Sequence, residues 1–138
     1  LYEASQAGVE IDLIVRGICC LIPGQTYSRN IRVTRIVDTF LEHARIWYFG
    51  NGGNPKLFLG SPDWMRRNLY RRIEAVTPIL DPDAKQELID MLSIQLSDKR
   101  KACFVDENLR NCWKSAHPQK EKVRSQYTFY EYLKEKTE

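Results

Sequence analysis

The chain has 138 residues, of which 43% are hydrophobic and 28% charged, and this composition is typical of one soluble domain with its own core. Its formal net charge of +3 is too small to indicate a strong nucleic-acid binder. The sequence contains no run of about 18 apolar residues that could span a membrane, and its first residues do not resemble a secretory signal. We therefore expect a cytoplasmic protein, with peripheral attachment to the inner face of the membrane left open.

The four cysteines lack the C-x-x-C or Cys/His spacing of a metal site; they are Cys19, Cys20, Cys103 and Cys112. Two of them are adjacent, so their side chains would point to opposite faces of an extended segment. The pattern therefore predicts buried, reduced thiols and no metal site.

Residues 1–8 resemble the last turns of a helix closed by a glycine, without a start signal for that helix. We therefore expect an N-terminally truncated fragment of a larger multidomain protein. Residues 9–15 alternate apolar and polar side chains, which predicts a strand that ends at Arg16. Residues 17–25 then read as a loop.

The next residues predict a short extended piece at 31–33 and a helix over 35–42, because apolar residues recur there at helical spacing. This helix would place His43 at its C-terminal end. The continuously apolar residues 46–49 predict a strand that is buried on both faces. A turn at 50–55, rich in Gly and Asn, and a strand at 56–59 would complete a hairpin.

The second half of the chain alternates between predicted strands and helices. We expect a strand over 71–75, a helix from the Asp81 cap to about residue 96, an edge strand at 102–105, a mobile loop over 110–122 and a final helix over 118–136. The order of elements predicts the α/β class, with a mixed sheet flanked by helices in a single domain.

Three basic residues are candidates for a phosphate site. A lone histidine is usually not functional, but His43 lies at a predicted helix-to-strand junction, where α/β proteins often bind ligands. Arg16 ends an apolar strand, and a half-buried arginine there needs an anionic partner, either a protein carboxylate or a phosphate. Arg72 lies in a cluster of four arginines, and Glu74 on the same predicted strand face could orient it. Together these arginines and the imidazole could handle a phosphoryl group.

Four segments, in order along the chain, closely resemble the C-terminal domain of bacterial polyphosphate kinase, the phospholipase-D-like type. They are residues 11–19 (IDLIVRGIC), 36–45 (IVDTFLEHAR), 61–69 (SPDWMRRNL) and 72–74 (RIE). The resemblance continues through Asp81 and Pro82 into the final helix, so it covers nearly the whole of residues 1–138. It implies a phospholipase-D-like fold.

The resemblance also implies an enzyme that reversibly transfers the terminal phosphate of ATP to polyphosphate, with Mg²⁺ accompanying ATP. Full-length members have four domains and two active-site histidines, and the histidine that is phosphorylated lies in the preceding domain. By motif match, His43 is similar to the second histidine, while Arg16, Arg72 and Glu74 are similar to residues that line the nucleotide-phosphate site. The implied partners are ATP or ADP, inorganic polyphosphate, the remaining domains and further copies in a homo-oligomer, with no specific nucleic acid.

Two other functions stay open at this point. One is a phospholipase-D-like phosphodiesterase, although the H-x-K-x4-D signature is not met, since position 45 is Arg and position 50 is Gly. The other is a non-catalytic module whose arginine cluster and basic residues 99–101 would bind RNA or another polyanion.

Overall fold

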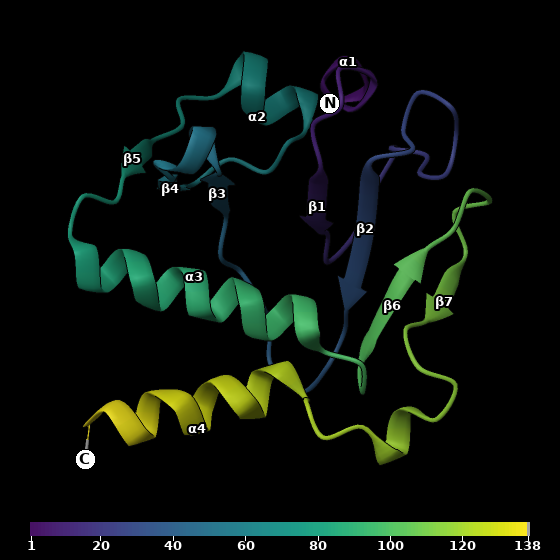
Figure 1. Cartoon of the computed structure of the whole chain (residues 1–138). Coiled ribbons are helices and arrows are strands. Elements are labelled where there is room, and N and C mark those ends of the chain that lie inside the picture. Colours follow the sequence, from purple (N-terminus) through teal and green to yellow (C-terminus); the bar gives the residue numbers. More distant parts are fainter. Residues whose placement is uncertain (138) are drawn as a thin grey trace. The chain divides into compact units, whose positions relative to one another are not determined.

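A computed structural model describes residues 1–137, which fall into two compact units (Figure 1). The first unit contains Leu1–Phe40 and the described residues from Ser93 onward, and the second contains Leu41–Leu92. Both contain strands and helices, as predicted for the α/β class, but the strands form two sheets where one was predicted.

The sheet of the first unit has four strands in the order β1-β2-β6-β7. The first pair is parallel and the other two pairs are antiparallel. Figure 1 shows these strands side by side; their bounds are β1 Ile11–Ile14, β2 Ile31–Ile36, β6 Ala102–Val105 and β7 Asn111–Trp113. The strand predicted at 102–105 therefore lies inside the sheet and not at its edge.

The core of the first unit lies along β2. Ile31 and Val33 are buried together with Val105 of β6, because alternate residues of a strand point to the same face. Helix α1 (Tyr2–Gln6) adds Tyr2, whose hydroxyl accepts a hydrogen bond from the Ile22 amide at 2.9 Å. This contact ties the loop after β1 to α1.

Helix α4 (Ser125–Thr137) begins beside a buried aspartate of the same unit. Asp98 has no solvent exposure, and its carboxylate accepts hydrogen bonds from the amides of Arg100, Lys101 and Ser125 at 2.7–2.8 Å. This carboxylate therefore joins the turn before β6 to the first residue of α4. A 3-10 turn, η2 (Pro118–Lys120), precedes this helix, so the predicted helix starts seven residues later than expected.

The sheet of the second unit is antiparallel, in the order β3-β4-β5. Its strands are β3 Ile46–Phe49, β4 Lys56–Gly60 and β5 Val76–Pro78. The predicted hairpin is confirmed: the 3-10 turn η1 (Asn51–Gly53) joins β3 to β4, and Gly52 and Gly53 supply its positive φ angles of 60° and 91°. A short helix, α2 (Arg66–Arg71), lies between β4 and β5 in the chain.

Gly60 at the end of β4 makes room for the indole ring of Trp47 on β3. A Cβ atom at position 60 would lie only 2.6 Å from Cζ3 of that ring and 2.9 Å from Cγ2 of Val76. Any larger residue would push these neighbours apart.

Helix α3 (Pro82–Ser97) starts as predicted. Asp81 Oδ1 accepts a hydrogen bond from the Ala84 amide at 2.8 Å, and Pro82 occupies the first helical position. Residues up to Leu92 belong to the second unit and those from Ser93 to the first.

The predicted helix over 35–42 is wrong. β2 continues to Ile36, which is buried and pairs with Ala102, and residues 37–45 form no regular element. The apolar residues that suggested a helical stripe are instead exposed: Val37, Phe40 and Leu41 are 59–77% accessible.

The predicted strand over 71–75 is also wrong, because α2 continues to Arg71 and β5 starts only at Val76. β3 is a strand, but Tyr48 and Phe49 are about half exposed, so it is not buried on both faces. The predicted mobile loop over 110–122 contains β7 and η2.

All four cysteines are free thiols, but the prediction that they are buried is wrong: Cys19 and Cys103 are only partly buried, and Cys20 and Cys112 are exposed. Burial raises the pKa of the Cys103 thiol, which favours its protonated form. Within residues 1–137, no group of three or more His, Cys, Asp or Glu side chains is placed to hold a metal ion. Nor does this part of the chain contain a helix long and apolar enough to cross a bilayer.

Candidate functional site

His43 lies in an exposed segment just before β3, and its ring contacts an arginine two residues later. Nη1 of Arg45 lies 3.0 Å from His43 Nδ1 and also donates to the main-chain oxygen of His43 at 3.2 Å. Nε of the same guanidinium donates to Asp63 Oδ1 at 3.0 Å. The three side chains thus form a chain from carboxylate to guanidinium to imidazole, all within the second unit.

The residues just before this segment are held by the start of α4, within the first unit. Arg124 makes two hydrogen bonds to the Asp38 carboxylate, at 2.6 and 2.7 Å. The side-chain amide of Gln126 donates to the Phe40 oxygen at 2.6 Å and accepts from the Phe40 amide at 2.7 Å. The chain is therefore fixed three residues before His43.

The ion pair between Asp38 and Arg124 is well shielded on the acidic side, since the Asp38 side chain is only 2% exposed. Hydrogen bonds from Arg124 hold the pKa of this carboxyl below its usual range, and they more than offset the effect of burial. The pair stays charged at neutral pH.

Arg16 follows β1 in the first unit and is exposed, so the expectation of a half-buried arginine is wrong. Its backbone neighbours are held by β2: the Val15 amide donates to the Thr34 oxygen at 2.9 Å, and Arg35 donates to the Gly17 oxygen at 3.0 Å. Glu10 and Asp12, two acidic residues close to Arg16 in the sequence, both accept hydrogen bonds from Arg32.

Glu74 forms hydrogen bonds with two other side chains of the second unit. One of its oxygens accepts a hydrogen bond from the Ser61 hydroxyl and the other accepts from Asn68 Nδ2 at 3.0 Å. Arg67 in turn donates from Nε to Asn68 Oδ1 at 3.3 Å. The predicted strand face shared by Glu74 and Arg72 does not exist; Glu74 is linked through Asn68 to Arg67 instead.

Arg72 caps the C-terminal end of α2 in an extended conformation and is exposed. The second unit therefore contains three of the predicted site residues, namely His43, Arg72 and Glu74, and the first unit contains Arg16. Exposed guanidiniums are donors suited to phosphate oxygens.

Arg45 and Asp63 were not predicted as site residues. The sequence spacing His-x-Arg was visible, but the partnership with a carboxylate 18 positions later was not. Asn68 was missed as well, although it is 5% exposed and a buried amide needs partners.

Comparison with known proteins gives consistent results. The family model described as "Polyphosphate kinase C-terminal domain 2" matches residues 1–126. The polyphosphate kinase of Synechocystis sp. is 60% identical over 103 residues, which are 74% of this chain and 14% of that protein. The polyphosphate kinase of Escherichia coli K12 is 47% identical over 135 residues, which are 97% of this chain and 20% of that protein.

A solved structure is also similar. The crystal structure of polyphosphate kinase from Porphyromonas gingivalis matches with a TM-score of 0.94 and 58% identity, covering 99% of this chain and 21% of that one. The chain thus spans about a fifth or less of the length of these three relatives.

Proposed function

The chain belongs to the polyphosphate kinase C-terminal domain family, and on that premise we propose that it is the C-terminal catalytic domain of a longer polyphosphate kinase. This enzyme reversibly transfers the terminal phosphate of ATP to polyphosphate. The observation that carries the proposal is His43, which lies in the family's motif order, is held by Arg45 and belongs to the same unit as the exposed Arg72.

The proposed chemistry needs positioning and charge stabilisation more than covalent work by this domain. Phosphoryl transfer spreads negative charge over the oxygens of the transferred group, and fixed cationic donors stabilise that charge. We assign Arg16 and Arg72 to phosphate oxygens and His43 to a hydrogen bond or proton transfer at the reacting group. The contacts of Glu74 support a role in orienting an arginine, through Asn68 to Arg67.

The substrates that follow are ATP or ADP and inorganic polyphosphate. Mg²⁺ would enter bound to the phosphates of ATP, where it neutralises charge. The remaining domains would supply the histidine that is phosphorylated, so we expect residues 1–138 alone to make no polyphosphate. We also propose a homo-oligomeric, cytoplasmic enzyme without a specific nucleic-acid partner.

The first test is synthesis by the full-length enzyme. Labelled ATP should yield long, acid-insoluble phosphate chains, and His43→Ala should lower the rate at least about 100-fold, because a positioned imidazole contributes at least that much. His117→Ala is the matched control, since this second histidine is exposed in the first unit and its ring should not take part.

Three results would contradict the proposal. Cleavage of phosphodiesters by the wild type would indicate a phospholipase-D-like hydrolase. Salt-sensitive polyanion binding without turnover would indicate a binding module. Synthesis by His43→Ala at the wild-type rate would remove His43 from the site.

A further inference from the structure

The contact between Arg45 and His43 fixes the position of the imidazole proton. A guanidinium has five N–H donors, no acceptor, and stays charged at any physiological pH. The ring nitrogen 3.0 Å from it, His43 Nδ1, must therefore be the acceptor and carry no proton. In a neutral imidazole the proton then lies on Nε2.

Arg45 is itself held from two sides. Asp63 accepts from its Nε at 3.0 Å, and the main-chain oxygen of His43 accepts from its Nη1 at 3.2 Å. The backbones of the pair are fixed as well, because the Gly60 amide donates to the Arg45 oxygen at 3.1 Å and the Met65 amide to the Asp63 oxygen at 2.7 Å. The Arg45 side chain is 21% exposed, so water competes only in part for its donors.

We infer that Arg45 and Asp63 are positioning residues that hold His43 as the neutral Nε2–H tautomer, so that its Nε2–H donates a hydrogen bond to an oxygen of the transferred phosphoryl group. The inference rests on the proposed function and gives this histidine its specific task. The proton stays on Nε2 throughout, and no bond forms between His43 and phosphorus. A hydrogen bond of this kind strengthens as charge develops in the transition state.

The geometry disfavours His43 as a general base and as a phosphoryl acceptor. A general base or a phosphoryl acceptor needs an unprotonated nitrogen that can reach the substrate. The unprotonated nitrogen here is Nδ1, and Arg45 occupies it. Asp63 acts on His43 only indirectly, because it orients the Arg45 guanidinium, which in turn orients the imidazole ring.

The first experiment compares kinetics of variants of the full-length enzyme. Arg45→Met keeps most of the side-chain volume but removes every donor, and kcat should fall on the order of 10- to 100-fold, as when an outer partner of a functional histidine is lost. KM for ATP should change less, since the lost interaction is strongest in the transition state. Arg45→Lys retains a cationic donor and should recover part of the rate. The kcat of Asp63→Asn should lie between that of Arg45→Lys and that of wild type.

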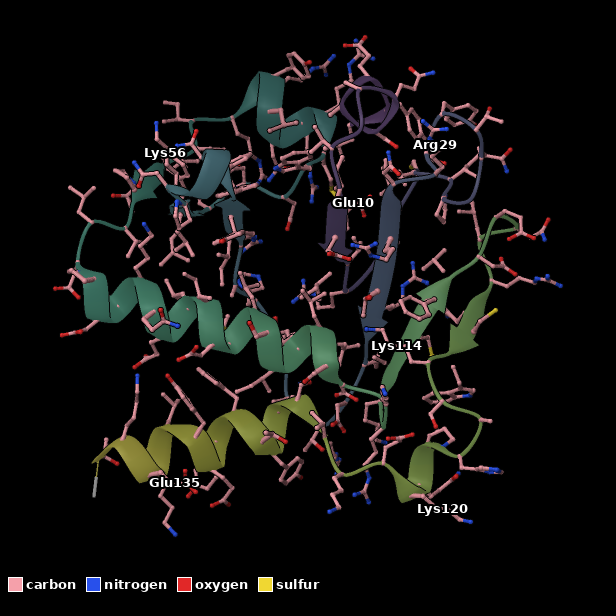
Figure 2. The ribbon with its side chains drawn as sticks, viewed as in Figure 1. Glu10, Arg29, Lys56, Lys114, Lys120 and Glu135 are labelled. Atoms are coloured by element: carbon pink, nitrogen blue, oxygen red, sulfur yellow. The ribbon has the colours of Figure 1, made fainter. Side chains whose placement is uncertain are left out.

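The matched control is Arg29→Met. Arg29 is exposed in the loop between β1 and β2, where Figure 2 labels it, and it has no place in the proposed machinery. The same chemical change there should leave kcat and KM at wild-type values.

The second experiment reads the tautomer without turnover. Ring ¹³C and ¹⁵N chemical shifts of full-length enzyme labelled at histidine, with His43 assigned by its loss in His43→Gln, should show Nε2 protonated and Nδ1 bare. Arg45→Met should shift the ring to a mixture of both tautomers. A merely structural role for Arg45 would not move this signature.

Different results would contradict the inference about Arg45 and the proposed function. Wild-type shifts with the proton on Nδ1, or an Arg45→Met variant with unchanged kcat or unchanged ring shifts, would overturn the inference. The wild-type shifts decide the tautomer even if Arg45→Met fails to fold. Absence of polyphosphate synthesis by wild type would instead contradict the proposed function, and the ring shifts would still report on the contact.

Discussion

The two units hold their strands in different ways. In the first unit, four of the six residues of β2 are buried, and Ile31, Val33 and Val105 form a common cluster. In the second unit, all of β5 and half of β3 are exposed, and within residues 41–92 Leu57 is the only large side chain that is fully buried.

The second unit also contains specific polar contacts. Glu74 links Ser61 to Asn68, and Asp63 holds Arg45. Such contacts are directional, whereas apolar packing is not. The comparison teaches that a unit with few fully buried side chains can still orient particular side chains through hydrogen bonds, and that unit contains His43.

Leu57→Ala should have the largest effect, because it removes the one fully buried large side chain of the second unit. Truncating a leucine that is 2% exposed should lower the free energy of unfolding of the second unit by about 3 kcal/mol. Hydrogen exchange in the full-length enzyme would show the loss as faster exchange within residues 41–92. Leu80→Ala, at an 84% exposed leucine of the same unit, should leave exchange unchanged. Equal acceleration in both units would show that they share one core.

Asp98→Ala should have the next largest effect, now in the first unit. It leaves three amides without their acceptor and should cost about 2 kcal/mol. Exchange should accelerate at the start of α4 and in the turn before β6. Asp81→Ala is the matched aspartate of the second unit; it is exposed, accepts from a single amide, and should cost only about 1 kcal/mol at the start of α3. A larger loss for Asp81 than for Asp98 would reverse the comparison.

The smallest expected effect is on the stability of the first unit at acidic pH. The pKa of Asp38 is lowered in the folded chain by Arg124, so the folded state binds fewer protons than the unfolded state between that lowered value and the ordinary one. The stabilisation is therefore present above about pH 4 and is lost as pH falls through the folded pKa.

Asp38→Asn should flatten this acid-side loss when thermal unfolding of the first unit is followed against pH. Asp12→Asn is the control: Arg32 lowers the pKa of that carboxyl too, but its side chain is 39% exposed, so solvent screens the pair and the change should be smaller. A steeper acid-side loss in Asp38→Asn than in wild type would contradict the sign of the linkage.

Local patterns predicted the elements that depend on local chemistry. The hairpin at Gly52 and Gly53 and the start of α3 at Asp81 follow from turn and capping residues. The error at 35–42 has a non-local cause, because Ile36 pairs with Ala102, 66 positions later. Apolar spacing alone could not tell this strand and the exposed residues after it from an amphipathic helix.

The residues of the candidate site likewise divide into those that the sequence predicts and those that only the fold brings together. His43, Arg16 and Arg72 could be named from motif order, and these assignments stay predictions. The partners that orient them could not be named, since Asp63 meets Arg45 and Asn68 meets Glu74 only after the second unit has folded. Residue types allow many such pairs, and the fold selects one of them.

The slot that Gly60 leaves for Trp47 has an optical consequence. Trp64 and Trp113 are 56% and 58% exposed, whereas Trp47 is partly buried against the hairpin. Of these three indoles, that of Trp47 should emit at the shortest wavelength, because fewer water dipoles relax around its excited state. The blue edge of the fluorescence spectrum is therefore a built-in reporter of the hairpin that follows His43.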